Sequence, residues 1–376
     1  MNIIPVVTQK HLKDFILLPN RLYKDDKGYI PPLMMERLEV LNPKKNPYFD
    51  HAEHQYFLAV DGNKIVGRIS AQIDRLNKPY EGKKVGHFGF LDAEDNGDVF
   101  SALIKTAEEW LKKRDIKYIT GPFNHSINEE AGLLIDGYDT PSVMMYPYNR
   151  AYTEKYLLNY GFTKAKDLYS YTYNVSHTKP IDAGNFLHRL DQNNRVKLRP
   201  YNPQNHGQEL KTIVSIFNDA WSDNWGFVPF TEKEIDHIAK SMKPLIVKDL
   251  IWIAEFDQRP ISMIVALPNI NEAIYDLNGS LFPLGLLKLL WRLKIKGLKT
   301  ARVLLFGLKK EYQKTPMASI LVMMLLEELR KNGKKHGFES AELGWILEDN
   351  TPTRRLIEHV GGKVSKIFRI YGKDLG

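Results

Sequence analysis

The stretch IWIAEFDQRPISMIVALPN, residues 251–269, contains two runs of apolar residues separated by a polar turn at 257–260. Alternation of apolar and polar residues is typical of a strand with one buried face, and polar residues with proline favour a turn. The stretch therefore predicts a β-hairpin. The same layout occurs in YFLAVDGNKIVGRISAQID (56–74), where the turn lies at 61–63. Each half of the chain thus carries one such hairpin.

The segments that follow the two hairpins also correspond. Each hairpin is followed by a strand, an amphipathic helix, a buried strand, a helix that ends at glycine, and a last strand. We expect these elements at 85–92, 98–115, 116–123, 154–162 and 167–175, and again at 301–308, 317–337, 339–347, 353–363 and 365–373. Because an internal duplication explains this order most simply, we predict two domains, 1–180 and 195–376, each closed by its own last strand. The stretch from Ser176 to about Asn194 is the expected connection.

The composition is that of a globular protein, with 43% hydrophobic and 26% charged residues. The absence of cysteine excludes disulfides, thiolate metal sites and a cysteine nucleophile. The first residues carry charges and no apolar core of signal-peptide length, so we expect a cytoplasmic protein. Residues 281–335 contain thirteen Lys or Arg and only three acids, in a chain with a net charge of +8. This region either attracts phosphate groups or is a lysine-rich solvated surface.

The order of hairpin, strand, helix, strand, helix and strand is that of the GNAT acyltransferases. The stretch FGLKKEYQKTPMASILVMMLLEEL (306–329) resembles the coenzyme-binding strand, loop and helix of that superfamily. The stretch GWILEDNTPTRRLIEHVGGKVSKIFRIYGKDL (344–375) resembles its strand, asparagine-containing turn, helix and final strand. Nearly the whole chain also resembles a family of two-domain bacterial GNAT-like proteins, for example in GPFNHSINEEAGLLIDGYD (121–139) and MMYPYN (144–149).

The resemblance implies an α/β (or α+β) fold of tandem GNAT-like domains, each with a mixed, mostly antiparallel sheet flanked by helices. It also implies transfer of an acyl group from acyl-CoA to an amine, including long chains onto sphingoid-type amines. In GNAT folds the strands on either side of the long helix part, and the thioester arm of coenzyme A lies between them. Amides at the start of the helix hold the pyrophosphate.

Carried over to the second domain, the resemblance assigns a binding site for acetyl-CoA or a longer acyl-CoA. Its residues are Leu308, Lys310, Gln313, Lys314, Met317, Ala318, Ser319, Asn350 and Arg354. The pattern around Asn350 is also typical of an ordinary helix start capped by Asp349 or Asn350.

Several positions depart from the family pattern. Pro316 replaces the usual central glycine of the loop and supplies no N–H, so we expect altered or weaker coenzyme binding. Ile357 stands where many members have the tyrosine that protonates the leaving thiolate. Tyr371 is the candidate substitute, although a tyrosine on a final strand is also typical of a core. The corresponding first-domain loop, LDAEDNGD (91–98), carries four acids that repel a diphosphate, so we expect no standard coenzyme site there.

The densest polar cluster is residues 124–130 within the stretch 121–139, directly before the apolar run AGLLI (131–135). A carboxylate against an apolar wall has a raised pKa and can act as a general base. We select Glu129 and Asn128 as candidate catalytic residues, with Glu129 preferred over Glu130. The same residues also fit a capping turn. The motif HAEH (51–54) offers too few ligands for a metal centre, and we expect no metal.

The segment LFPLGLLKLLWRLKIKGLK (281–299) is rich in leucine but too interrupted by cations to span a bilayer. At helical spacing, Leu286, Leu287, Leu290 and Leu293 share one face and the cations occupy the other. Such a helix lies in a membrane interface or forms a lid over its own domain. We expect peripheral contact with the inner face of the membrane.

Three functions remain open from the sequence. The first is an acyl-CoA-dependent N-acyltransferase with a small-molecule or lipid amine as acceptor. The second is an aminoacyl transferase of the Fem type, whose tRNA donor would use the basic surface. That class has a coiled-coil arm and no sustained heptad occurs here, so we expect no nucleic acid partner. The third is a GNAT-derived binding protein without catalysis, consistent with Pro316 and Ile357. The sequence does not specify the oligomeric state.

Overall fold

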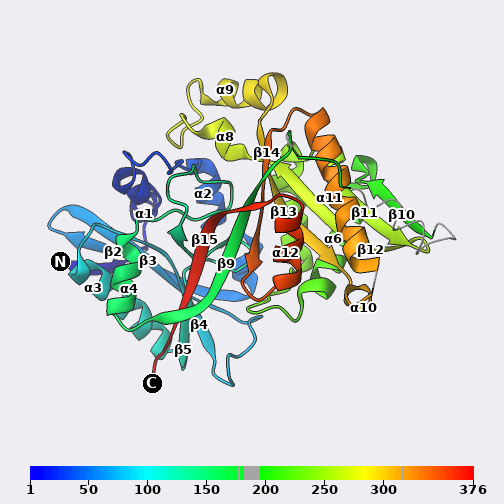
Figure 1. The fold of residues 1–376 in the computed structure, drawn as a ribbon. Coiled ribbons are helices and arrows are strands. Elements are labelled where there is room, and N and C mark those ends of the chain that lie inside the picture. Colours follow the sequence, from blue (N-terminus) through cyan, green and yellow to red (C-terminus); the bar gives the residue numbers. More distant parts are fainter. Residues whose placement is uncertain (177, 182–194, 316) are drawn as a thin grey trace.

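The computed structural model describes residues 1–176, 178–181, 195–315 and 317–376 (Figure 1). Its strands are β1 (Asn2–Pro5), β2 (Ala52–Asp61), β3 (Lys64–Asp74), β4 (Val85–Ala93), β5 (Tyr118–Gly121), β6 (Phe123–Asn124), β7 (Glu130–Ala131), β8 (Leu133–Asp136), β9 (Thr163–Asn174), β10 (Val196–Pro200), β11 (Ile251–Phe256), β12 (Arg259–Pro268), β13 (Thr300–Leu308), β14 (Ser340–Leu347) and β15 (Lys363–Asp374). Its α-helices are α1 (Gln9–Leu22), α2 (Met34–Val40), α3 (Gly97–Lys112), α4 (Tyr152–Asn159), α6 (His206–Trp221), α7 (Glu232–Met242), α8 (Ile270–Ile274), α9 (Gly285–Trp291), α10 (Lys310–Gln313), α11 (Met317–Lys335) and α12 (Thr351–His359). Short 3-10 helices cover Pro47–Asp50, Pro203–Asn205, Lys243–Leu245 and Lys248–Leu250, and a π-helix covers Arg292–Lys296.

Thirteen of the described strands form one continuous sheet, in the order β1-β2-β3-β4-β5-β15-β9-β14-β13-β12-β11-β10, with β8 beside β15. Neighbouring strands are antiparallel except for the parallel pairs β4–β5 and β13–β14. The two predicted hairpins are the pairs β2–β3 and β11–β12, and the repeated order of elements is present in both halves. The predicted fold class, a tandem arrangement with a mixed and mostly antiparallel sheet, is therefore confirmed.

The closing strands of the two halves are exchanged. The last strand of the first half, β9, pairs with β14 of the second half, where Tyr171 lies opposite Leu343. The last strand of the second half, β15, pairs with β5 of the first half, where Tyr371 lies opposite Gly121. In Figure 1, β9 and β15 run side by side through the centre, and the C-terminal end lies with the first half. The expectation that each domain is closed by its own last strand is therefore wrong.

The physical reason for this error is that strands pair through backbone hydrogen bonds, which are the same for any sequence. β9 and β15 are both twelve-residue strands that mix buried and less buried residues, so neither length nor composition singles out the partner of β5. Most of the predicted connection, residues 182–194, lies outside the described part of the chain.

Helices cover both faces of each half of the sheet. In the first half α3 and α4 pack on one face and α1 packs on the other. Successive residues of β2 point to opposite faces, so Phe57 packs against the first pair of helices and Leu58 against α1. In the second half α11 and α12 cover one face and α6 covers the other. A further buried cluster lies at the centre and joins the two halves, with Phe368 of β15 packed among Leu134, Leu168 and Leu347.

The halves are also tied by a buried histidine from the HAEH motif. The Nδ1 atom of His51 lies 2.9 Å from the carboxylate of Asp74, and its Nε2 atom lies 3.4 Å from the carboxylate of Glu234 on α7. Burial alone lowers the pKa of His51, but Asp74 and Glu234 outweigh it and raise the pKa to about 9. His54, the other histidine of the motif, packs against Phe49.

Candidate functional site

The parallel strands β13 and β14 part halfway along their length. They pair from Thr300 and Ser340 as far as Val303 and Leu343, and no pairing follows beyond that point. β4 and β5 part in the same way after His87 and Thr120. The predicted opening between the strands on either side of the long helix is therefore present in both halves.

An arginine fills the closed end of the opening between β13 and β14. Arg302 is buried and donates hydrogen bonds to the carbonyl oxygens of Gly344 and Met144. Its guanidinium lies 3.8 Å from the centre of the Tyr146 ring. Burial lowers the pKa of Arg302, and the charges of Tyr146 and Glu342 act in the opposite direction. Met144 and Tyr146 come from the first half, so both halves build this end of the opening.

The open end of the same gap is aromatic. The indole N–H of Trp221 donates to the carbonyl oxygen of Phe306 at 3.0 Å, and the rings of Trp221 and Trp345 lie 6.0 Å apart. Phe306 and Trp345 are half-buried. Beyond Val303 and Leu343 the two strands are not paired with each other, and apolar rings line the space between them.

At the predicted phosphate end, Lys310 is already engaged. Its backbone N–H donates to the Asp219 carboxylate at 2.8 Å, and its ammonium pairs with Asp223 at 2.6 Å. The side-chain amide of Gln313 turns back to the carbonyl oxygen of Leu308 at 2.8 Å. The acids come from the end of α6, far upstream in the sequence, so inspection of the loop alone could not reveal them. Two of the predicted coenzyme residues therefore have internal partners.

The remaining residues of this loop surround the start of α11. Met317 and Ala318 are half-buried, and the Ala318 N–H donates to Thr315. Ser319 and Lys314 are exposed, and Lys314 has no ion-pair partner in the described part of the chain. Pro316, on which the expected weakening of coenzyme binding rests, lies outside the described residues.

Asn350 and Arg354 have structural partners. The Asn350 side chain caps α12 by accepting from the Thr353 N–H at 3.3 Å, which is the helix-start interpretation left open by the sequence. Arg354 donates to the hydroxyl of Tyr171 at 2.8 Å and lies over the ring of Tyr169 at 3.7 Å. Both tyrosines belong to β9, so Arg354 ties the second half to the exchanged strand.

The polar loop of the first half reaches the second half. The side-chain amide of Asn128 donates to the carbonyl oxygen of Val228 at 2.9 Å. The Glu129 carboxylate lies 3.3 Å from His125 Nδ1, and the other ring nitrogen of His125 lies 2.7 Å from the hydroxyl of Tyr56. The Glu129 side chain is 32% exposed, so this carboxylate remains accessible while a buried histidine supports it.

Tyr371 is not brought together with the coenzyme loop. It lies in the core of the first half because β15 is exchanged, and its hydroxyl donates to Glu154 of α4 at 2.5 Å. Burial and the neighbouring carboxylate raise the pKa of Tyr371. Its position is that of a core tyrosine with a satisfied hydroxyl.

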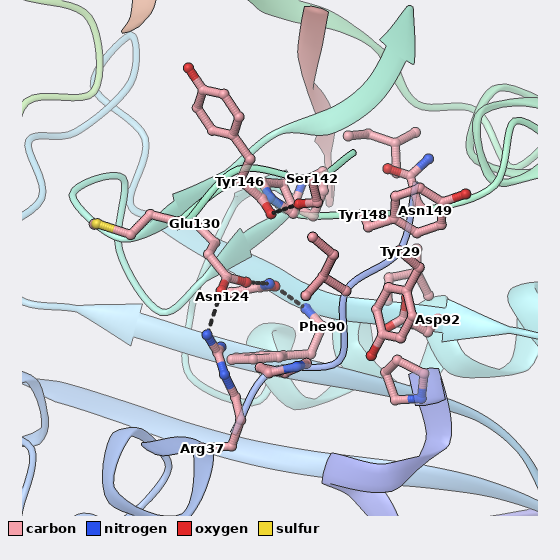
Figure 2. A pocket seen from close by; sticks show the side chains of 18 of the residues that line it. Tyr29, Arg37, Phe90, Asp92, Asn124, Glu130, Ser142, Tyr146, Tyr148 and Asn149 are labelled. Atoms are coloured by element: carbon pink, nitrogen blue, oxygen red, sulfur yellow. Dashed lines mark hydrogen bonds and ion pairs between the residues drawn. The ribbon is translucent and has the colours of Figure 1, made fainter. Parts of the chain in front are cut away.

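A polar cavity of about 120 Å³ lies in the first half, beside the diverging end of β4 (Figure 2). Two half-buried ion pairs line it, Arg37 with Glu130 at 2.7 Å and Arg68 with Asp92 at 2.7 Å. The other side chains labelled in the picture are Tyr29, Phe90, Asn124, Ser142, Tyr146, Tyr148 and Asn149. Tyr146, Tyr148 and Asn149 belong to the stretch MMYPYN, and Asn124 and Glu130 belong to 121–139; both stretches carried the family resemblance. Tyr29 and Arg37 carried no such signal in the sequence.

Glu130, and not Glu129, faces this cavity. Figure 2 shows its carboxylate between Arg37 and Asn124, and the Asn124 amide donates to it at 2.6 Å. The oxygen of the Asn124 side chain accepts from the N–H of Phe90, which has a left-handed backbone at φ 46°. Burial alone raises the pKa of Glu130, but Arg37 and Asn124 outweigh it and lower the pKa. Glu130 is therefore an ionised carboxylate paired with Arg37. A carboxylate whose pKa is lowered is a poor proton acceptor.

Tyr146 connects the cavity with the opening in the second half. It lines the cavity, and its ring, which Figure 2 shows directed away from Glu130, packs on Arg302. Its hydroxyl lies 2.7 Å from the Ser170 hydroxyl, and Ser170 donates to Glu342 at 2.6 Å. Tyr146 thus contacts both the cavity and the arginine at the closed end of the opening.

In the described residues, no three His, Asp or Glu side chains are arranged to hold a metal ion. No helix of the described part has the length and apolar character needed to cross a bilayer.

The chain is 44% identical over all of its 376 residues to the bacterial ceramide synthase of Caulobacter vibrioides, of which 98% is covered. It is 42% identical over 98% of its length to protein YghO of Escherichia coli, of which 94% is covered. Among solved structures, a tandem GNAT protein from the clavulanic acid biosynthesis pathway superposes with a TM-score of 0.59 at 11% identity, covering 100% of this chain and 98% of that chain. No protein-family model matches the sequence.

Proposed function

Because the chain belongs to the GNAT superfamily, in the family that includes the bacterial ceramide synthase of Caulobacter vibrioides, we propose that it transfers an acyl group from acyl-CoA to the amine of a long-chain acceptor. The observation that carries the proposal is the opening between β13 and β14, which lies directly before the long helix α11. A parted strand pair offers unpaired backbone groups to an extended thioester arm, and the start of a helix favours anions.

The residues around the opening in the second half are better suited to bind the thioester arm of acyl-CoA than its pyrophosphate. The gap has a charged closed end at Arg302 and aromatic walls at Trp221 and Trp345, which suit an apolar chain. At the phosphate end, Lys310 is bound by carboxylates, so Lys314 and the first free amides of α11 have to hold the pyrophosphate. When bound, acyl-CoA supplies an activated carbonyl carbon and a thiolate leaving group. We therefore expect moderate affinity for the nucleotide part and a larger contribution from the acyl chain.

The acceptor amine has to lose a proton before its nitrogen forms the amide bond, while the carbon–sulfur bond breaks and the thiolate takes up a proton. We assign proton acceptance to Glu129, because it is accessible, is backed by His125, and sits in a loop that Asn128 fixes to the second half. We assign the first-half cavity to the hydroxyl groups of the acceptor's head, since Glu130 and Asp92 present carboxylates there beside Asn124. The amine then lies outside the cavity, on the side of Glu129.

The test is an assay of thiol release with acetyl-CoA or palmitoyl-CoA as donor and a long-chain amino alcohol as acceptor, with the amide product identified by mass spectrometry. Glu129→Gln is expected to lower kcat by about 100-fold or more, the usual effect of removing a general base. Glu130→Gln is expected to raise KM for the acceptor with a smaller change in kcat. Thermal unfolding of each variant shows whether the fold is retained.

The coenzyme site is tested by charge reversal. Lys310→Glu with Lys314→Glu is expected to raise KM for acyl-CoA at least tenfold, whereas Asp95→Asn with Asp98→Asn in the first half is expected to leave it unchanged. If the second pair of changes alters KM and the first does not, the coenzyme lies in the first half. If no donor gives thiol release and no acyl-CoA binds in calorimetry, the proposed activity is refuted.

One observation favours a second function, that of a binding protein without catalysis. Four of the nine residues expected to hold coenzyme A have internal partners, namely Lys310, Gln313, Asn350 and Arg354. A protein of this kind would bind the long-chain amine in calorimetry and would release no thiol from any acyl-CoA.

A further inference from the structure

Large apolar side chains are exposed together at one end of the second half. Eight of the fourteen large apolar residues that are exposed in the described chain lie between Tyr275 and Ile295. They are Tyr275, Phe282, Leu284, Leu286, Leu287, Leu290, Trp291 and Ile295, and their exposed fractions range from 39% to 75%. We call this set the apolar face. Figure 1 shows α9, which carries half of these residues, projecting from the top of the molecule. Soluble proteins rarely leave a contiguous patch of this kind uncovered.

The apolar face is held rigidly from behind. Leu289 and Leu293 pack against the core of the second half, and buried Arg292 donates to the carbonyl oxygen of Ala273 at 2.7 Å and to the Asp276 carboxylate. The expected grouping of Leu293 with the exposed leucines is therefore wrong, because it lies on the inner side with Leu289. The exposed leucines lie on the other side of the segment from this contact.

The charges around the apolar face have one sign. No acidic residue occurs between Asp276 and Glu311, whereas eight lysines and arginines do. Asp276 itself is neutralised by Arg292 and Lys288. Lys294 and Lys296 are exposed beside Ile295 and have no ion-pair partner in the described residues. An apolar surface with cations interspersed is complementary to a lipid surface that combines anionic headgroups with acyl chains.

We propose that the apolar face docks reversibly on an anionic membrane, with the leucines and Trp291 inserted among the lipids and Lys294 and Lys296 at the headgroups. The segment that carries the apolar face contacts the wall of the first-half cavity. The Met34 N–H donates to the carbonyl oxygen of Gly279 at 2.9 Å, and the preceding segment supplies Tyr29 and Pro32 to the cavity wall. Asn271 of α8 lines the same cavity. A long-chain molecule in the bilayer thus has a short route to the cavity.

The experiment is co-sedimentation of the purified full chain with phosphatidylcholine vesicles that contain either no anionic lipid or about one third phosphatidylglycerol, at low and high salt. Binding is expected only with phosphatidylglycerol and is expected to weaken at high salt. Leu287→Ser with Leu290→Ser is expected to lower the partition coefficient by about 100-fold at either salt concentration. Lys294→Gln with Lys296→Gln is expected to lower it by roughly 30-fold at low salt and little at high salt.

Matched controls lie in the first half. Leu158 is an exposed leucine on α4, and Lys105 and Lys112 are exposed lysines on α3. Leu158→Ser, and Lys105→Gln with Lys112→Gln, are expected to bind vesicles as the unaltered chain does. No substrate is present, so the result does not depend on the proposed acyl transfer.

Two outcomes would overturn the proposal. One is that the unaltered chain ignores anionic vesicles. The other is that light scattering shows a dimer that the Leu287 and Leu290 changes dissociate while vesicle binding is unaffected, which would assign the apolar face to a second copy of the chain.

Discussion

The contact of His51 with Asp74 and Glu234 predicts a stability that depends on pH. His51 and Asp74 belong to the first half and Glu234 belongs to α7 of the second, so this contact ties the halves. The perturbation is His51→Gln, which keeps a hydrogen-bonding side chain and removes the charge. His359→Gln is the matched control, because His359 is exposed at the end of α12.

The size of the effect follows from the pKa. A shift from 6.5 in the unfolded chain to about 9 in the folded protein sets an upper limit of about 3 kcal/mol. The 3.4 Å contact with Glu234 lacks the geometry of a hydrogen bond, so we expect about 1.5 kcal/mol. Because the folded pKa is the higher one, this stabilisation is complete below pH 6.5 and is lost as the pH rises through 9.

The assay is urea unfolding of both variants and the unaltered chain at pH 6 and near pH 10, followed by tryptophan fluorescence. The free energy of unfolding of His51→Gln is expected to lie about 1.5 kcal/mol below that of the unaltered chain at pH 6, and the difference is expected to vanish near pH 10. The control should show no such change. A difference that stays constant with pH would mean that His51 acts by packing alone, and the charge argument would be refuted.

Three further predictions concern the exchanged strands and the caps. Phe368→Ala is expected to cost about 3–5 kcal/mol in one cooperative unfolding transition, since Phe368 lies in the cluster shared by both halves; two separate transitions would contradict this. Tyr371→Phe is expected to lower stability by about 1 kcal/mol through loss of the Glu154 bond and to leave kcat unchanged, whereas a tenfold loss of kcat would restore Tyr371 as the acid. Asn350→Ala is expected to cost about 1 kcal/mol in thermal or urea unfolding through loss of the α12 cap, with Thr351→Ala as an exposed control.

The local elements were predictable because each depends on residues close together in sequence. The alternating runs around 61–63 and 257–260 form hairpins in the structure, and the apolar period of 317–335 forms the long helix α11. The parting of β13 from β14 was also predicted, because the order of the elements resembles that of the GNAT fold, in which the strands on either side of the long helix part. The pairing of β15 with β5 did not follow, because backbone hydrogen bonds carry no information about which of two similar strands is used.

The site was predicted less well, for a related reason. Lys310 and Arg354 were selected for their charge, and the partners that bind them, Asp219 and Tyr171, come from distant parts of the chain. The Arg37–Glu130 pair likewise joins α2 to a strand far along the sequence. Asn128, by contrast, was selected from local polarity and does reach the second half.

The exchange of β9 and β15 has a consequence for the order of events during synthesis. β5 and its partners β1 to β4 emerge from the ribosome long before β15, so the edge of β5 is open while the second half is being made. The first closing strand to emerge is β9. Any pairing of β9 with β5 at that stage would have to be undone when β14 and β15 arrive, because β9 pairs with β14 and β15 pairs with β5 in the folded protein. The nascent chain therefore faces a choice between a local partner that comes first and a distant partner that completes the sheet.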